Sequence, residues 1–68
     1  MEEFKIKGAY IELIQLLKII GVAQSGGHAK MIVEEHLIFR NGELETRKRA
    51  KLVPGDVIEV ENQKVLLK

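Results

Sequence analysis

The sequence predicts an α+β fold in which two helices pack on one face of a small, mainly antiparallel sheet. Apolar residues at helical spacing occupy the first half of the chain, and short apolar runs occupy the second half. Two turn signals, Asn41-Gly42 and Pro54-Gly55-Asp56, separate those runs. A length of 68 residues predicts one domain spanning residues 1–68.

The N-terminal segment predicts a strand followed by a helix. Phe4 and Ile6 alternate with lysines, as in a strand with one buried face. From Tyr10 to Ile20 polar residues recur every three positions and nearly everything between them is apolar. This pattern predicts a helix buried over most of its circumference. Gly21 is typical of the left-handed residue that ends a helix.

A second helix is predicted to begin after Ser25. A serine at this position is a good N-cap, and Ala29, Ile32 and Val33 follow at helical spacing. Glu34 and Glu35 lie near the expected end, where the helix dipole disfavours acids. We therefore expect this end either to fray or to be stabilised by neighbouring cations.

The C-terminal half predicts four short strands joined by turns. Asn-Gly is the strongest short hairpin signal, because both central residues of its turn adopt positive φ. Phe39, on the first of these strands, is expected in the core. The predicted order is β-α-α-β-β-β-β, with the last four strands near residues 37–40, 43–45, 57–60 and 65–67.

Composition excludes several classes of protein. The chain has no cysteine, which excludes disulfides and thiolate metal sites, and no apolar stretch near ~20 residues. The acidic, mixed N-terminus does not resemble a signal peptide, so we expect a cytoplasmic protein without a membrane partner. His28 and His36 are spaced too far apart for a shared metal on one helix face.

Catalysis is not expected either. A pocket of at least ~300 Å³ would be a large hole in a body this small. Ser25 is the only serine, and no acid–base partner is placed beside it by the sequence. We predict neither an enzyme, nor a cofactor, nor a small-molecule substrate.

The segment Thr46–Lys51, here called the basic loop, is the main candidate for ligand binding. The net charge is only +1, yet this loop holds four cations and no acid. Arginine and lysine contact phosphate oxygens, arginine with two parallel hydrogen bonds. The alternative is a solvated loop whose charges only confer solubility. The cations concerned are Arg47, Lys48, Arg49 and Lys51.

The start of the second helix is the other candidate. Two glycines follow Ser25, although glycine disfavours helix. Their presence suggests that a ligand or another segment of the protein comes close to the backbone here. Free N–H groups and the helix dipole attract anions, and His28 and Lys30 add donors. The alternatives are a flexible loop, or glycines that let the two helices pack closely.

The motifs, taken together and in order, resemble the S-four RNA-binding domain, an αL module, and in particular its small freestanding bacterial subgroup. The helix ends in Gly21-Val22-Ala23-Gln24-Ser25, and Lys30 follows on the second helix. A strand then leads into Asn41-Gly42, and the basic loop leads into Pro54-Gly55-Asp56-Val57-Ile58-Glu59-Val60. Each piece is common alone, but their joint spacing is much more specific.

The resemblance implies RNA binding. Two departures stand out: Gly26 replaces an RNA-contacting arginine of many members, and Arg40 replaces an apolar strand residue. The expected RNA-facing residues are Ser25, Gly27, His28, Lys30, Arg40, Arg47, Lys48, Arg49 and Lys51.

We therefore expect a module that recognises structured RNA, ribosomal or transfer RNA, with the ribosome as a possible partner. Low aromatic content argues against a base-stacking platform and for the reading of backbone and shape. One alternative is a protein-interaction module that docks on a ribosomal or replication protein, with the C-terminal strands as an edge for strand addition. DNA binding is another alternative.

Overall fold

The computed structural model describes all 68 residues and confirms the α+β class. Its five-stranded sheet has the order β1-β7-β6-β3-β4, and a separate pair is formed by β2 and β5. Only β1 and β7 run parallel. The elements are β1 (Glu2–Phe4), β2 (Ile11–Glu12), α1 (Leu13–Ile19), α2 (Gly26–Glu34), β3 (Ile38–Arg40), β4 (Glu43–Leu44), β5 (Lys51–Leu52), β6 (Val57–Val60) and β7 (Gln63–Leu67).

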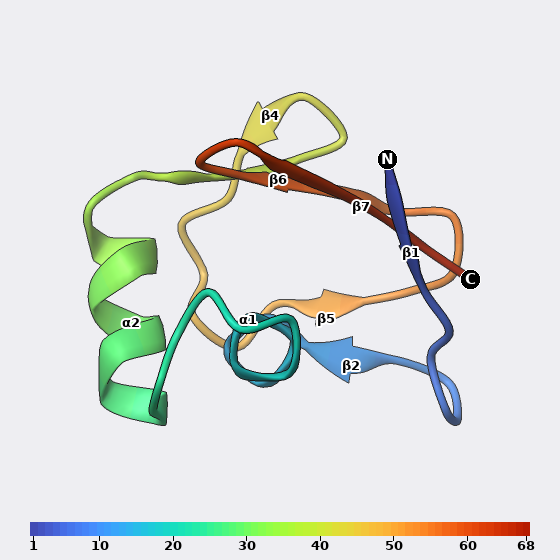
Figure 1. Cartoon of the computed structure of the whole chain (residues 1–68), viewed down its shortest axis with the longest axis horizontal. Coiled ribbons are helices and arrows are strands. Elements are labelled where there is room, and N and C mark those ends of the chain that lie inside the picture. The colour runs from blue at the N-terminus through green and yellow to red at the C-terminus, as the bar shows by residue number, and fades with distance from the viewer.

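Both helices and the β2–β5 pair lie on the same side of the five-stranded sheet (Figure 1). The core between them is built by alternation along the strands. On β6, Ile58 and Val60 are fully buried, whereas Glu59 between them faces solvent. Leu16 and Leu17 of α1 fill the opposite side of this core. No helix is long and apolar enough to cross a membrane.

The first helix is shorter than predicted. Ile11 and Glu12 form β2 instead of a helical turn, because they pair with Leu52 and Lys51 of β5. Tyr10 precedes this strand and lies outside the helix. The prediction of burial around most of the helix is also wrong, since Ile19 is 53% exposed. The pairing partners lie some 40 residues away along the chain, so local periodicity carried no sign of them.

Phe39 is not in the core, which contradicts the prediction. It is 40% exposed on the outer sheet face, opposite Leu44 of β4 and Glu59 of β6. Strand alternation sends Ile38 and Arg40 inward instead. An arginine takes this inward position because carboxylates lie there to receive it.

The predicted turns are confirmed. Asn41 and Gly42 have φ values of 54° and 86°, as the hairpin signal requires. Gly21 has a φ of 84° after α1, in the left-handed region that favours glycine.

The proposed edge for strand addition is absent at the C-terminus. β7 lies between β1 and β6, and the edges of the large sheet are β1 and β4. The C-terminal strands therefore have their backbone groups paired on both sides, and they offer no ladder to an incoming strand.

Candidate nucleic-acid interface

The basic loop is anchored by Ala50. This residue is 3% exposed, its N–H donates to the carbonyl oxygen of Arg47 at 3.2 Å, and its own carbonyl accepts from the N–H of Leu13 at 2.9 Å. Because Ala50 takes the inward position, the cations around it point to solvent. The side chains of Arg47 and Arg49 are 70% and 73% exposed.

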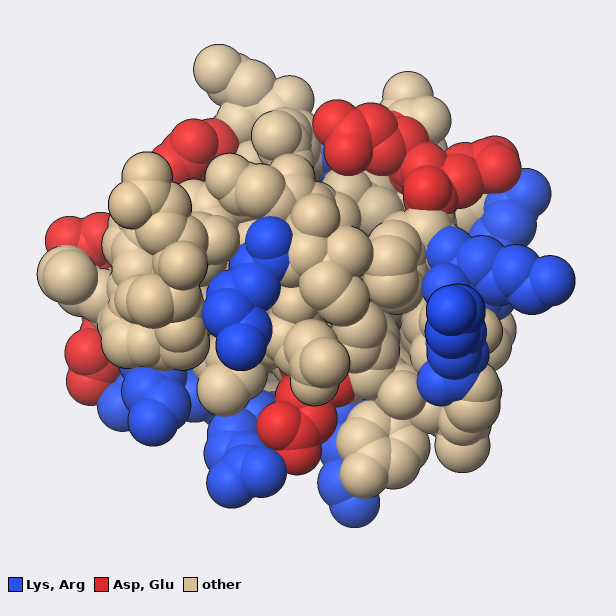
Figure 2. Space-filling view, turned by 60° about the horizontal axis from the view of Figure 1, so that its bottom comes forward, with Lys and Arg blue, Asp and Glu red and all other residues tan.

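Each of the first three cations has a carboxylate partner. Arg47 lies 3.2 Å from Glu45, Arg49 lies 3.2 Å from Glu12, and Lys48 lies 2.8 Å from Glu34. The cations therefore reach toward different elements. Figure 2 shows that basic and acidic side chains are interspersed on one face of the molecule. All three cations are exposed to solvent, and an exposed pair such as Lys48–Glu34 contributes only about 0–1 kcal/mol, so a phosphate can compete for the cations.

The Lys48 pair accounts for the end of α2. The hydrogen bond from Lys48 is the main cause that holds the pKa of Glu34 below its ordinary value. A cation from the basic loop thus offsets the acid that the helix dipole disfavours. This contact confirms the expectation that neighbouring cations stabilise the end of the second helix.

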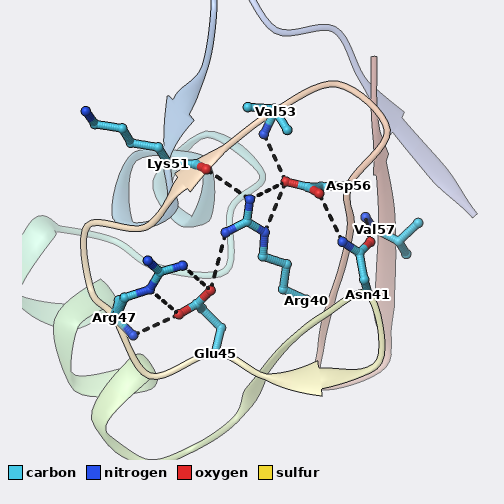
Figure 3. Close-up of polar contacts among 8 residues, drawn as sticks. All are labelled: Arg40, Asn41, Glu45, Arg47, Lys51, Val53, Asp56 and Val57. Carbon is cyan, nitrogen blue, oxygen red and sulfur yellow. Dashed lines mark hydrogen bonds and ion pairs between the residues drawn. The ribbon is translucent and has the colours of Figure 1, made fainter.

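Arg40 ties the two ends of the basic loop together (Figure 3). Its Nε and Nη2 donate to Asp56 Oδ2 at 3.1 and 2.8 Å, and Nη2 also donates to the carbonyl oxygen of Lys51 at 3.0 Å. Its Nη1 lies 3.5 Å from Glu45 Oε1. Arg40 is therefore an inward-facing strand residue, and only 21% of its side chain is exposed.

Asp56 is the centre of this network. Besides Arg40, it accepts hydrogen bonds from the Asn41 side chain at 3.0 Å and from the Val53 N–H at 2.9 Å. The Asn41 side chain also accepts from the Val57 N–H at 2.8 Å. The two turns predicted from sequence are therefore joined by one carboxylate and one amide.

Hydrogen bonding outweighs burial at both network carboxylates. Burial alone would raise the pKa of Asp56, but the donors Val53, Asn41 and Arg40 bring the pKa below its usual value. Burial likewise acts to raise the pKa of Glu45, and the hydrogen bonds from Arg47 and Arg40 lower it overall. Both groups are consequently held in the ionised form by the fold.

These pKa shifts predict a loss of stability in acid. A carboxyl whose pKa is depressed in the folded state stabilises the fold above its unfolded pKa of about 4, and this contribution disappears as the pH falls through the folded pKa. We expect the urea concentration at the unfolding midpoint to decrease when the pH is lowered below about 4. The decrease is expected to be smaller in an Asp56→Asn, Glu45→Gln double variant. Equal acid sensitivity in both proteins would contradict this assignment.

An open hollow of about 520 Å³ collects four of the predicted cations. Its lining consists of Arg40, Arg47, Arg49, Ala50 and Lys51. Lys48 does not line this hollow, since its side chain extends to α2. No acidic residue lines it, although Glu45 and Glu12 are the partners of two of its arginines.

The start of α2 forms a separate region. Ser25 is confirmed as the N-cap, because its Oγ accepts from the His28 N–H at 3.1 Å, and His28 Nδ1 accepts from the Gln24 N–H at 3.1 Å. A Cβ on Gly26 would meet nothing within 4 Å, so close helix packing does not require this glycine. None of the residues Ser25, Gly27, His28 and Lys30 lines a hollow.

The basic loop and the start of α2 do not form a single groove. Lys48 contacts Glu34 at the C-terminal end of α2, whereas Ser25 caps the other end. A helix of nine residues rises about 13 Å, so Ser25 and Glu34 are separated by about this distance along the axis of α2. A ligand that touches both regions must therefore be extended or large.

The cap of α2 predicts a modest stability effect. Replacement of Ser25 by alanine removes the acceptor for the His28 N–H and is expected to cost about 1 kcal/mol in the free energy of unfolding, measured by urea denaturation. Ser25→Asp is the control, because an aspartate both caps the helix and suits its dipole. An alanine variant as stable as the aspartate variant would rule out this role.

Sequence reasoning missed three residues of this region. The sequence indicates Asp56 only as part of a turn, although a Pro-Gly-Asp turn leaves a carboxylate that can accept hydrogen bonds. Glu45 was assigned to a strand end, and Tyr10 to a helix. Tyr10 instead lies with its ring 5.1 Å from Lys51 Nζ, a cation–π contact beside the basic loop.

This arrangement defines the chain as an αL-type nucleic-acid-binding fold, and comparison with known proteins agrees. The family model described as the S4 domain matches residues 4–68. The chain therefore belongs to the S4 (S-four) domain family.

Particular relatives are bacterial. The probable ribosome maturation protein RlbA of Bacillus subtilis is 47% identical over 51 residues, which cover 75% of this chain and 72% of RlbA. The putative RNA-binding protein YbcJ of Escherichia coli is 40% identical over 52 residues, which cover 76% of this chain and 74% of YbcJ. The solution structure of E. coli YbcJ, described as an αL motif involved in RNA-binding, matches with a TM-score of 0.73 and 35% identity over 98% of this chain and 86% of that one.

Proposed function

We propose that residues 1–68 form a single RNA-binding domain that recognises structured RNA, ribosomal or transfer RNA, through the basic loop and the start of α2. The observation that carries this proposal is the hollow lined by Arg40, Arg47, Arg49 and Lys51. The described roles of the relatives, ribosome maturation and RNA binding, support the choice of RNA and of the ribosome as partner.

The mechanism is phosphate contact by a loop that is already ordered. The anchored Ala50 and the Arg40 network fix the loop, so binding requires little ordering of backbone. Arg47 and Arg49 exchange their carboxylate partners, Glu45 and Glu12, for phosphate oxygens, which they can contact with two hydrogen bonds each. Lys51 supplies a further positive charge at the edge of the hollow.

Two separated contact regions favour a folded RNA. The basic loop and the start of α2, with Ser25, Gly27, His28 and Lys30, lie at different ends of the second helix. An RNA helix presents phosphates across this distance, whereas a single small anion cannot reach both regions. The proposal is binding without catalysis, and it includes the cytoplasm as the location because ribosomal and transfer RNA are found there.

The salt dependence of binding tests the proposal. About four phosphate contacts predict a slope of log K against log salt near −3 to −4. Fluorescence anisotropy with purified ribosomal RNA fragments and with transfer RNA would measure this slope, and duplex DNA would serve as the comparison. An affinity that does not change with salt, or equal binding to duplex DNA, would contradict the proposal.

One observation favours the second candidate function, docking on a ribosomal protein. Phe39 and Leu44 are 40% and 43% exposed and face each other across β3 and β4 on the outer sheet face, away from the helices. A Phe39→Thr, Leu44→Thr variant that keeps its affinity for RNA but loses cosedimentation with nuclease-treated ribosomal particles would support docking. Unchanged cosedimentation would exclude this surface.

A further inference from the structure

A second open hollow, of about 730 Å³, lies between α1 and the segment that joins β1 to β2. We call it the tyrosine hollow. Its walls combine two aromatic rings and aliphatic side chains with two exposed lysines. The lining residues used below are Phe4, Lys5, Lys7, Tyr10, Glu12 and Ile19.

The tyrosine hollow borders the cationic hollow of the basic loop. Tyr10 lines the first and Lys51 lines the second, and the Lys51 Nζ lies 5.1 Å from the centre of the Tyr10 ring. Likewise, Glu12 lines the tyrosine hollow and Arg49 lines the cationic hollow, and Arg49 Nη2 lies 3.2 Å from Glu12 Oε2. The two hollows therefore meet along one boundary, and a chain of phosphates over the basic loop could continue past Tyr10.

The exposed apolar surface here has no partner within the molecule. Tyr10 is 43% exposed and Ile19 is 53% exposed. Lys51 is positioned beside the Tyr10 ring, with its Nζ 5.1 Å from the ring centre. An exposed aromatic ring beside lysines is the combination that proteins use to stack a nucleobase while they neutralise its phosphate.

We propose that the tyrosine hollow binds one unpaired nucleotide of the RNA, with its base on the Tyr10 ring and Ile19 and its phosphates near Lys5 and Lys7. This inference rests on the proposed RNA-binding function and extends it to a specific subsite. Phe4 is the other aromatic residue of the hollow and is half-buried, so Tyr10 is its one exposed ring. One exposed ring accommodates one base, so the subsite does not amount to a platform for single strands. The Glu12 carboxylate also lines the hollow and is released when Arg49 contacts a phosphate, so the positive charges of Lys5 and Lys7 have to outweigh its negative charge.

The consequence is a preference for RNA in which a helix adjoins an unpaired nucleotide. The paired part supplies phosphates to Arg47 and Arg49, and the unpaired nucleotide enters the tyrosine hollow. A blunt helix would occupy the basic loop alone. The N-terminal segment would thereby add selectivity to contacts that otherwise read only backbone and shape.

Nuclear magnetic resonance of the full chain can separate the two contacts. We would titrate it with a blunt RNA hairpin and with the same hairpin carrying a short 3′ adenosine tail. Both hairpins are expected to shift the amide signals of residues 46–51. Only the tailed hairpin is expected to shift the Tyr10 ring signals and the methyl signals of Ile19.

Two variants at one position provide the affinity test. Tyr10→Leu removes the ring and is expected to abolish most of an approximately tenfold preference for the tailed hairpin, whereas Tyr10→Phe keeps the ring and the preference. Circular dichroism of both variants checks that they remain folded. If Tyr10→Leu does not fold, the Lys5→Ala, Lys7→Ala variant is used instead and is expected to lower the same preference.

The outcomes distinguish this inference from the proposed function. Binding of both hairpins with equal affinity, or shifts confined to the basic loop, would overturn the subsite and leave the RNA-binding function intact. If a peptide fills the tyrosine hollow while the adenosine tail stays bound to the protein, the proposed subsite would also be overturned. Failure of either hairpin to shift residues 46–51 at low salt would contradict the proposed function and the subsite together.

Discussion

Replacement of Asp56 by alanine is expected to lower the free energy of unfolding by about 3 kcal/mol, as measured by urea denaturation. The carboxylate accepts from the Arg40 guanidinium, the Asn41 amide and the Val53 N–H. Without it a half-buried guanidinium loses its main partner, and the two turns lose the group that joins them. A chain of 68 residues has a total stability of only roughly 3–10 kcal/mol, so much of it would be lost.

Two controls separate this effect from a general loss of charge. Glu59→Ala removes an exposed carboxylate from the outer sheet face and is expected to cost less than about 0.5 kcal/mol. A double-mutant cycle of Asp56→Ala with Arg40→Ala should be clearly non-additive, because both changes break the same contacts. Additive effects, or a loss for Asp56→Ala as small as for Glu59→Ala, would show that the network does not stabilise the fold.

The elements that local sequence determines were predicted well. Asn41-Gly42 requires only its own positive φ angles, and Ser25 requires only the N–H three residues later, so both are readable in a short window. The pairing of Ile11 with Leu52 is different. It depends on where α1 and the basic loop meet, and neither segment carries the alternation that marks a longer strand.

Arg40 and Phe39 show why the inward and outward faces of β3 were misassigned. Hydropathy alone places the phenylalanine inside and the arginine outside. The opposite arrangement is stable because Asp56 and Glu45, 16 and 5 residues further along the chain, supply carboxylates on the inner side. An arginine buried with two acids could be inferred from sequence only if the pairing of the strands were already known.

The candidate interface was predicted by composition but not in its geometry. The run of cations in the basic loop is visible in the sequence, whereas their partners are not: Arg49 pairs with Glu12, 37 residues away, and Lys48 pairs with Glu34, 14 residues away. The start of α2 was correctly assigned as a capped helix end. Its separation from the cationic hollow could be seen only in three dimensions.

Replacement of both Arg47 and Arg49 by alanine is expected to weaken RNA binding roughly 60-fold at about 0.1 M salt, and to make the salt slope shallower by about 1.8. Among the ion-paired cations of the basic loop, Arg47 and Arg49 have the most exposed side chains. Each of the two is expected to contact one phosphate. Lys48 is left unchanged because its contact with Glu34 supports the end of α2. The Arg49–Glu12 pair contributes about 0–1 kcal/mol, and Glu45 keeps Arg40 as a partner when Arg47 is removed, so the variant is expected to remain folded.

Lys64→Ala with Lys68→Ala is the matched control, since it removes the same charge from another part of the surface. Lys64 lies opposite Glu59 on β6, and Lys68 pairs with Glu3 of β1. If RNA is attracted only by net charge, the two double variants lose the same affinity and their salt slopes remain equal. If the basic loop holds the phosphates, only the arginine variant shows the shallower slope, because only there are counterions no longer released by direct contact.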